Sequence, residues 1–89
     1  MRIEITTPLS GRIVKELTIN EKVRLSDIVK LIISDLGINI NYSDLESYYL
    51  VAVNGNQLGE GVKWDEVFLT NDDYVVILPL AFGGSTLLG

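Results

Sequence analysis

The spacing of apolar and polar positions divides the chain into segments with different periods. Residues 2–6 and 12–20 alternate between polar and apolar, which is typical of strands with one buried face. Lys15 falls on the inward face of the second segment, so we expect that strand at a sheet edge, where the ammonium group can reach water. Residues 7–11 contain Pro and Gly and supply the turn. These segments predict an antiparallel hairpin.

One strongly helical pattern follows. Six apolar residues recur at the spacing that gives a helix a single apolar face: Leu25, Ile28, Val29, Ile32, Ile33 and Leu36. Either Arg24 or Ser26 is expected at the N-cap, and Gly37 is expected to end the helix in a left-handed conformation. Residues 38–47 are predicted as a loop that includes up to one helical turn from Ser43.

Two uninterrupted apolar runs predict the remaining long strands. Residues 48–53 precede Asn54-Gly55, the strongest short hairpin signal in the chain, and a short return strand begins at Gln57. Residues 74–78 predict a central strand buried on both faces, because no polar residue marks a solvent side. Pro79 cannot donate to a ladder, so we expect pairing to end near it.

The order of these elements predicts the fold class. A hairpin, a helical crossover and a return beside the first strand indicate an α+β, β-grasp arrangement, with a mixed sheet of about five strands and one helix packed across one face. Residues 1–82 are expected to form this domain, and residues 83–89 a flexible tail that carries Gly83-Gly84 and a five-residue extension. Trp64 is expected to cover part of the core.

Composition excludes several kinds of chemistry. The 89 residues include no cysteine and no histidine, which rules out disulfides, thiolate nucleophiles and Ser-His triads, and we expect neither a metal site nor a bound cofactor. The net charge is −5 and the seven basic residues are scattered, so nucleic acid is not expected as a partner. No apolar run is long enough to span a bilayer, and we expect a soluble, cytoplasmic protein without membrane contact.

Gly83-Gly84 is the candidate reactive feature. A glycine pair on an extended tail offers a main-chain group with no side chain to obstruct another active site. A frayed terminus that happens to contain two glycines is the simpler alternative. The residues upstream decide between these interpretations.

Three segments resemble the ubiquitin-like MoaD/ThiS sulfur-carrier family, which includes the ubiquitin-related modifier and the archaeal small modifiers. They are Val51-Ala52-Val53-Asn54-Gly55, the helix start Leu25-Ser26-Asp27-Ile28-Val29, and the stretch from Leu69 to Gly84. The family's turn has the form Leu-x-Asp-Gly-Asp, and here Asp72 replaces the glycine, in a conformation that Asp can adopt at some cost. Family carriers normally stop at the second glycine, whereas this chain continues through Ser85-Thr86-Leu87-Leu88-Gly89.

The resemblance implies a carrier with no catalytic residues of its own. A partner activating enzyme uses ATP to adenylate the carboxylate of Gly84, with Gly83 beside it, and the acyl group then passes to sulfur or to a thiol. A tail-processing protease must first cut after Gly84. If Val75 and Ile77 point into the core, Val76 and Leu78 point to the bare sheet face, and we expect the activating enzyme to dock there and on Leu80 and Phe82.

Several functions remain open from the sequence. The chain is either a sulfur carrier, which forms a thiocarboxylate for a sulfur-acceptor enzyme of molybdopterin, thiamine or tRNA thiolation, or a modifier conjugated to lysines of target proteins. A non-reactive β-grasp protein-interaction domain and a molybdopterin synthase small subunit are alternatives. An enzyme built on Asp65, Glu66, Asp72 and Asp73 is disfavoured, because such acidic pairs are usually solvated turn residues.

Overall fold

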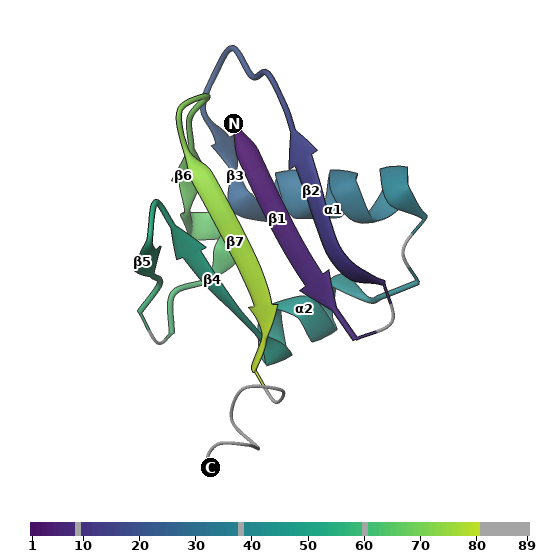
Figure 1. Cartoon of the computed structure of the whole chain (residues 1–89). Helices are drawn as coiled ribbons and strands as arrows, with labels where there is room; N and C mark the ends of the chain where they lie inside the picture. The colour runs from purple at the N-terminus through teal and green to yellow at the C-terminus, as the bar shows by residue number, and fades with distance from the viewer. Residues whose placement is uncertain (9, 38, 60, 81–89) are drawn as a thin grey trace.

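The protein is an α+β domain with a five-stranded mixed sheet, a second two-stranded sheet and two α-helices (Figure 1). The computed structural model describes residues 1–8, 10–37, 39–59 and 61–80. The main sheet has the order β2-β1-β7-β4-β5, in which β1 and β7 are parallel and the other neighbours antiparallel. These strands span Gly11–Glu16, Arg2–Thr7, Tyr74–Pro79, Tyr49–Val53 and Asn56–Gln57 respectively.

The predicted first hairpin is confirmed, with a shorter second strand. β1 and β2 pair antiparallel from Arg2 opposite Glu16 to Thr7 opposite Gly11. Because β2 is an edge strand, the side chain of Lys15 reaches the rim of the inner face, where its Nζ lies 3.2 Å from a carboxylate oxygen of Asp35. The alternating pattern therefore indicated both the pairing and the edge position correctly.

β7 occupies the centre of the sheet, as predicted, but it is buried on one face only. Val75 and Ile77 are fully buried, whereas Tyr74 and Leu78 are 38% and 45% exposed. An uninterrupted apolar run carries no period, so it does not reveal that one side of the strand faces water. The prediction of a strand buried on both faces was wrong for this reason.

The helix α1, Leu25–Leu36, packs on the face of the sheet opposite to those exposed side chains (Figure 1). Four of its six predicted stripe residues are buried: Leu25, Ile28, Val29 and Ile32. Arg24 rather than Ser26 is the N-cap, without a side-chain hydrogen bond, and Gly37 ends the helix with a φ of 66°. Within the part of the chain that the structure describes, no helix has the length and apolar character needed to cross a bilayer.

A second helix, α2 at Tyr42–Tyr48, corrects the expectation of a single helix. The side chain of Asn41 caps it by accepting a hydrogen bond from the Ser43 amide at 2.8 Å. Leu45 is fully buried, and the Tyr42 ring meets Trp64 edge to face at 5.8 Å. Asn41 and Asp44 are local signals of a helix start, but the helix is short and held mainly by tertiary packing, which periodicity does not detect.

The small sheet joins β3, Val23–Arg24, to β6, Phe68–Leu69, beside the short 3-10 helix η1 at Trp64–Glu66. Trp64 is only 4% exposed, so it belongs to the core instead of covering it loosely. The backbone amide of Leu25 donates to the Val67 carbonyl at 2.8 Å and ties this corner to the start of α1. The core comprises Ile3, Ile5, Leu25, Ile28, Val29, Ile32, Leu45, Val51, Trp64, Leu69, Val75 and Ile77.

Candidate functional site

β7 ends at Pro79, four residues before the glycine pair in the sequence. The strand is held on both sides, by β1 as far as Ile77 and by β4 as far as the pair of Tyr49 with Pro79. Leu80, which follows, is 42% exposed. Phe82, Gly83, Gly84 and residues 85–89 lie outside the described residues. The sheet therefore fixes the position from which the sequence continues towards the glycine pair.

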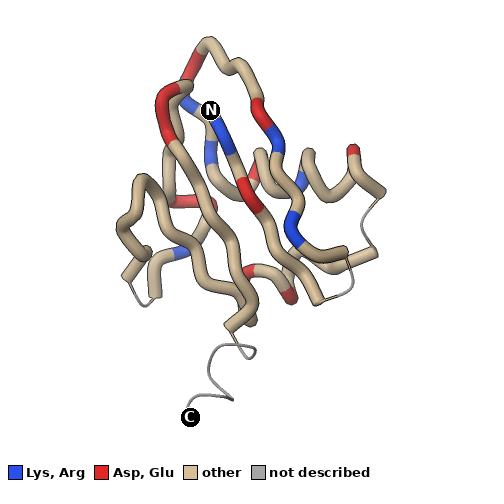
Figure 2. Tube along the Cα trace, in the orientation of Figure 1, with Lys and Arg blue, Asp and Glu red and all other residues tan. Residues whose placement is uncertain are grey.

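The sheet face turned away from α1, which we call the outer face, has an uncharged half formed by β4 and β7. Val76 lies opposite Ala52 and Leu78 opposite Leu50, and all four are half-buried or exposed. Neither strand contains a charged residue, and the acidic pair Asp72-Asp73 lies in the turn just before β7 (Figure 2). Val76 and Leu78 thus lie on the bare face, as the alternation predicted.

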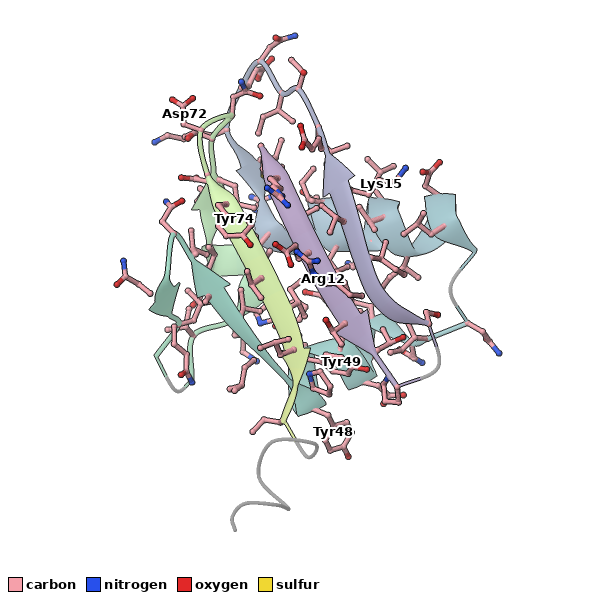
Figure 3. All side chains as sticks on the ribbon, in the orientation of Figure 1. Arg12, Lys15, Tyr48, Tyr49, Asp72 and Tyr74 are labelled. Atoms are coloured by element: carbon pink, nitrogen blue, oxygen red, sulfur yellow. The ribbon has the colours of Figure 1, made fainter. Side chains whose placement is uncertain are left out.

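Leu80 lies beside a hollow of about 300 Å³ at the edge of this uncharged half. Leu50, Leu58 and Val62 also line it, and Val62 is 41% exposed. Tyr48, which is 61% exposed, projects at the same end of the molecule (Figure 3). Apolar surface next to the start of the tail is therefore larger than the four residues predicted from the sequence.

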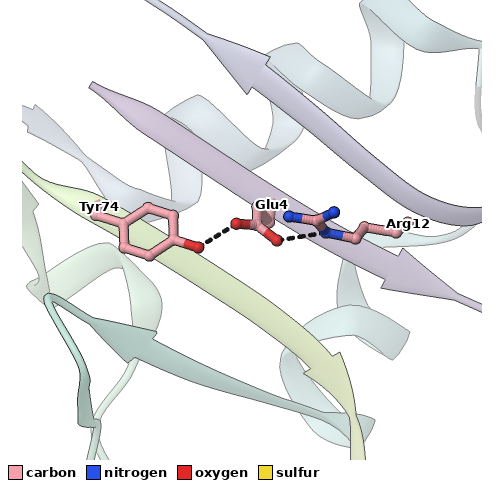
Figure 4. Close-up of polar contacts among 3 residues, drawn as sticks. All are labelled: Glu4, Arg12 and Tyr74. Atoms are coloured by element: carbon pink, nitrogen blue, oxygen red, sulfur yellow. Dashed lines mark hydrogen bonds and ion pairs between the residues drawn. The ribbon is translucent and has the colours of Figure 1, made fainter.

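Beside this uncharged half, the outer face carries a polar cluster of Glu4, Arg12 and Tyr74, from the adjacent strands β1, β2 and β7 (Figure 4). Arg12 Nε donates to Glu4 Oε1 at 2.7 Å, and the Tyr74 hydroxyl donates to Glu4 Oε2. Glu4 is only 7% exposed. The hydrogen bonds from Arg12 and Tyr74 lower the pKa of Glu4 to about 2, so the carboxylate is ionised at neutral pH.

The Asn-Gly turn and the turn before β7 are joined by side chains. Asn54 Oδ1 accepts a hydrogen bond from the Tyr74 amide at 2.9 Å, and Asn54 Nδ2 donates to Asp73 Oδ1 at 2.9 Å. Asp73 Oδ2 also accepts a hydrogen bond from the Thr70 amide at 2.7 Å. The hydrogen bonds from the Thr70 amide and the Asn54 side chain hold the pKa of Asp73 below its usual value. These hydrogen bonds therefore fix the position at which β7 begins.

Asp72 does not adopt the left-handed conformation expected from the family's turn glycine. Among the described residues other than glycine, Asn54 alone has a positive φ, at 54°. The turn instead closes through the Asp73 amide, which donates to the Thr70 carbonyl at 3.1 Å. A glycine is not required at position 72 for this geometry.

The acidic residues considered as an enzyme site do not come together in the fold. Asp65 and Glu66 lie on η1, whereas the carboxylate of Asp73 is engaged in the turn that it helps to form. Across residues 1–8, 10–37, 39–59 and 61–80, no three acidic side chains come together in a way that would hold a metal ion.

The sequence did not single out Glu4, Arg12 or Tyr74. Glu4 and Tyr74 are 70 positions apart, so only the strand pairing brings them together. The one local signal is a glutamate at an interior position of the first strand, where a buried acid needs partners. No protein-family model matches the chain, and a search of curated proteins finds no match either.

Proposed function

We propose that the chain is a ubiquitin-like β-grasp carrier or modifier, in which the Gly84 carboxylate becomes an acyl donor after adenylation by a separate activating enzyme. The observation that carries the proposal is the position of β7. This strand is central, pairs with β1 and β4, and ends at Pro79. A rigid strand followed in sequence by Gly83-Gly84 is the arrangement that such a donor needs.

The β-grasp assignment draws support from the connectivity. A hairpin of β1 and β2 leads into α1, and β7 returns parallel to β1 on its other side. α1 lies across one face only, which leaves the outer face open (Figure 1). α2 and the β3–β6 pair are additions to the simple pattern and leave this connectivity unchanged.

The proposed reaction sequence has three steps. Hydrolysis of the Gly84-Ser85 peptide bond, by a processing protease, gives a carboxylate on Gly84 and an amine on Ser85. The carboxylate attacks the α-phosphate of ATP and releases pyrophosphate, which forms an acyl adenylate. A sulfide nucleophile then displaces AMP to leave a thiocarboxylate, or a lysine amine displaces it, directly or through a thioester, to leave an isopeptide bond.

The uncharged half of the outer face fits the docking step. Val76, Leu78 and Leu80 present apolar area next to the start of the tail, and Phe82 extends this series in the sequence. An apolar centre with a polar rim is the usual anatomy of a protein interface. Docking there would hold the tail in the activating enzyme while the chemistry occurs at its end.

Pyrophosphate exchange tests the proposal. The substrates are a form ending at Gly84, the same form with Gly84→Ala, and the 89-residue chain, each offered with ATP to the adenylating enzymes of the source organism. We expect exchange with the form ending at Gly84 alone, because the Ala variant adds a Cβ on the carbon next to the reacting carboxylate and the longer chain has no carboxylate there. Equal exchange by the full chain would show that the extension is no block. Exchange with none of the forms would remove Gly84 from this role and favour an interaction domain.

Mass spectrometry of the protein taken from its native cell distinguishes a sulfur carrier from a modifier. A thiocarboxylate replaces one oxygen by sulfur and appears as the corresponding mass shift in the intact protein. A modifier instead leaves isopeptide-linked adducts on lysines of other proteins. Neither product would be found if the chain acts only as a binding domain.

A further inference from the structure

In the cluster on the outer face, each carboxylate oxygen of Glu4 accepts a hydrogen bond from within the chain. Glu4 belongs to β1, an interior strand, and its two carboxylate oxygens receive Arg12 Nε and the Tyr74 hydroxyl (Figure 4). With 7% of the residue exposed, the carboxylate is covered by the two side chains that it binds. Glu4 therefore does not recognise anything outside the chain and acts by fixing the positions of Arg12 and Tyr74.

The Nε of Arg12 is bound within the chain, whereas its two terminal guanidinium nitrogens are not bound by any residue that the structure describes. Its side chain is 61% exposed although Nε is bound to Glu4. Within the described residues, the guanidinium makes no hydrogen bond other than the one to Glu4. A guanidinium has five donors in a planar fork, so the terminal nitrogens of Arg12 remain available in an orientation that Glu4 fixes.

The charge around Arg12 is uneven. Arg12 lies opposite the neutral Thr6, and its ion pair with Glu4 is formed through Nε alone, at 2.7 Å. The chain as a whole carries −5, and the strands on the other half of the outer face are uncharged. Arg12 thus presents exposed guanidinium donors, held in place by its ion pair with Glu4, at the rim of an apolar surface on an acidic protein.

We infer that Arg12 is a specificity-determining contact, whose terminal guanidinium nitrogens bind a carboxylate on the activating enzyme, with Glu4 as the positioning residue. The inference rests on the proposed function and names the partner chemistry of its docking face. A guanidinium binds a carboxylate through two parallel hydrogen bonds, and Arg and Tyr are enriched among residues that dominate interfaces. On an acidic protein, an acidic side chain of the partner is more favourable beside Arg12 than beside one of the carboxylates, so this contact contributes to the register of docking.

The test measures pyrophosphate exchange with the form ending at Gly84, and it separates the KM for the carrier from kcat. We expect Arg12→Gln to raise KM about tenfold with kcat unchanged, as for an interfacial anchor remote from the reacting carbon. Lys15→Gln is the matched control, because it removes one positive charge from the same strand on the other face of the sheet. Its KM should stay close to that of the unsubstituted form.

Two further variants separate recognition from folding. Glu4→Gln/Arg12→Gln removes both charges, so no unpaired carboxylate stays buried, and its KM should match that of Arg12→Gln alone. Glu4→Gln by itself should raise KM by a smaller factor, because the guanidinium remains but is no longer fixed.

The outcomes distinguish the two proposals. Equal KM values for Arg12→Gln and Lys15→Gln, or a folded double variant with unchanged KM, would overturn the assignment of Arg12 while exchange itself continues. Absence of exchange by the unsubstituted form would instead remove the proposed function, and this inference with it.

Discussion

The side-chain amide of Asn54 donates to the carboxylate of Asp73, 19 positions later, at 2.9 Å. Asn54 also accepts from the Tyr74 amide, and its own amide donates to the Tyr74 carbonyl at 2.7 Å. One side chain thereby joins the β4–β5 turn to the first residue of β7. The Asn-Gly turn that marks the hairpin in the sequence also anchors the central strand.

Replacing Asn54 should separate the side-chain contribution from that of the backbone. Asn54→Gly tolerates the positive φ but loses both side-chain hydrogen bonds, and we expect it to lower the free energy of unfolding by about 1–3 kcal/mol. Asn54→Ala should cost about 1–2 kcal/mol more, because its Cβ opposes the left-handed conformation. Urea unfolding measures both. Asn56→Ala, on the exposed return strand, is the control, and an Asn54→Gly variant no less stable than this control would refute the role.

The two faces of α1 differ in their tolerance to truncation. Ile32 is 3% exposed and Leu31 is 58% exposed. We expect Ile32→Ala to cost about 2–5 kcal/mol through lost burial and a cavity, and Leu31→Ala to change stability by less than about 0.5 kcal/mol. Ile32→Asp should abolish the cooperative melt, since it buries a charge without a partner. Similar losses at positions 31 and 32 would show that α1 packs differently.

Acid should weaken the domain partly through Glu4. Its pKa falls from the usual 4.5 to about 2 in the folded protein, so its contribution to stability is complete above pH 4.5 and is lost as the pH falls towards 2. The unfolding free energy of wild type minus that of Glu4→Gln should therefore be constant at neutral pH and shrink over this interval. Asp73 contributes acid sensitivity of the same sign to both proteins and cancels in the difference. A difference independent of pH down to 2 would mean that folding does not lower the pKa of Glu4.

A charge on the uncharged half of the outer face should impair activation. Val76→Glu retains a partly exposed position, so we expect the fold to persist while the KM for the activating enzyme rises about tenfold or more. Leu31→Glu introduces the same charge on α1, on the opposite side of the sheet, and serves as the control. Equal exchange kinetics for the two folded variants would exclude this face from docking.

The parts of the fold that repeat a local period were predictable. The α1 stripe, the first hairpin, Asn54-Gly55 and the end of β7 at Pro79 follow from spacing and from residues with restricted backbones. The sequence predicts no more than one turn where α2 forms, because the helix depends on the burial of Leu45 and on the contact of Tyr42 with Trp64. β3 and β6 contribute two residues each, too few to show any period.

The candidate site was predictable only in part. Alternation along β7 correctly assigned Val76 and Leu78 to the outer face once one neighbour was known to be buried. Glu4, Arg12 and Tyr74 escaped detection because their contact depends on the register of three strands. Gly84 and its chemistry remain a prediction, since the position lies outside the described residues.

The parallel pairing of β1 with β7 also determines how the domain responds to mechanical force. Arg2 lies beside Tyr74, so the beginning of β1 and the end of β7 are at opposite ends of the ladder. Tension applied through residue 1 and through the chain beyond Pro79 therefore shears the two strands along each other. Parallel ladder bonds are evenly spaced, so they share this load instead of opening one by one. An unfolding machine that pulls on the chain beyond Pro79 while residue 1 is held would therefore meet its greatest resistance at the β1–β7 ladder.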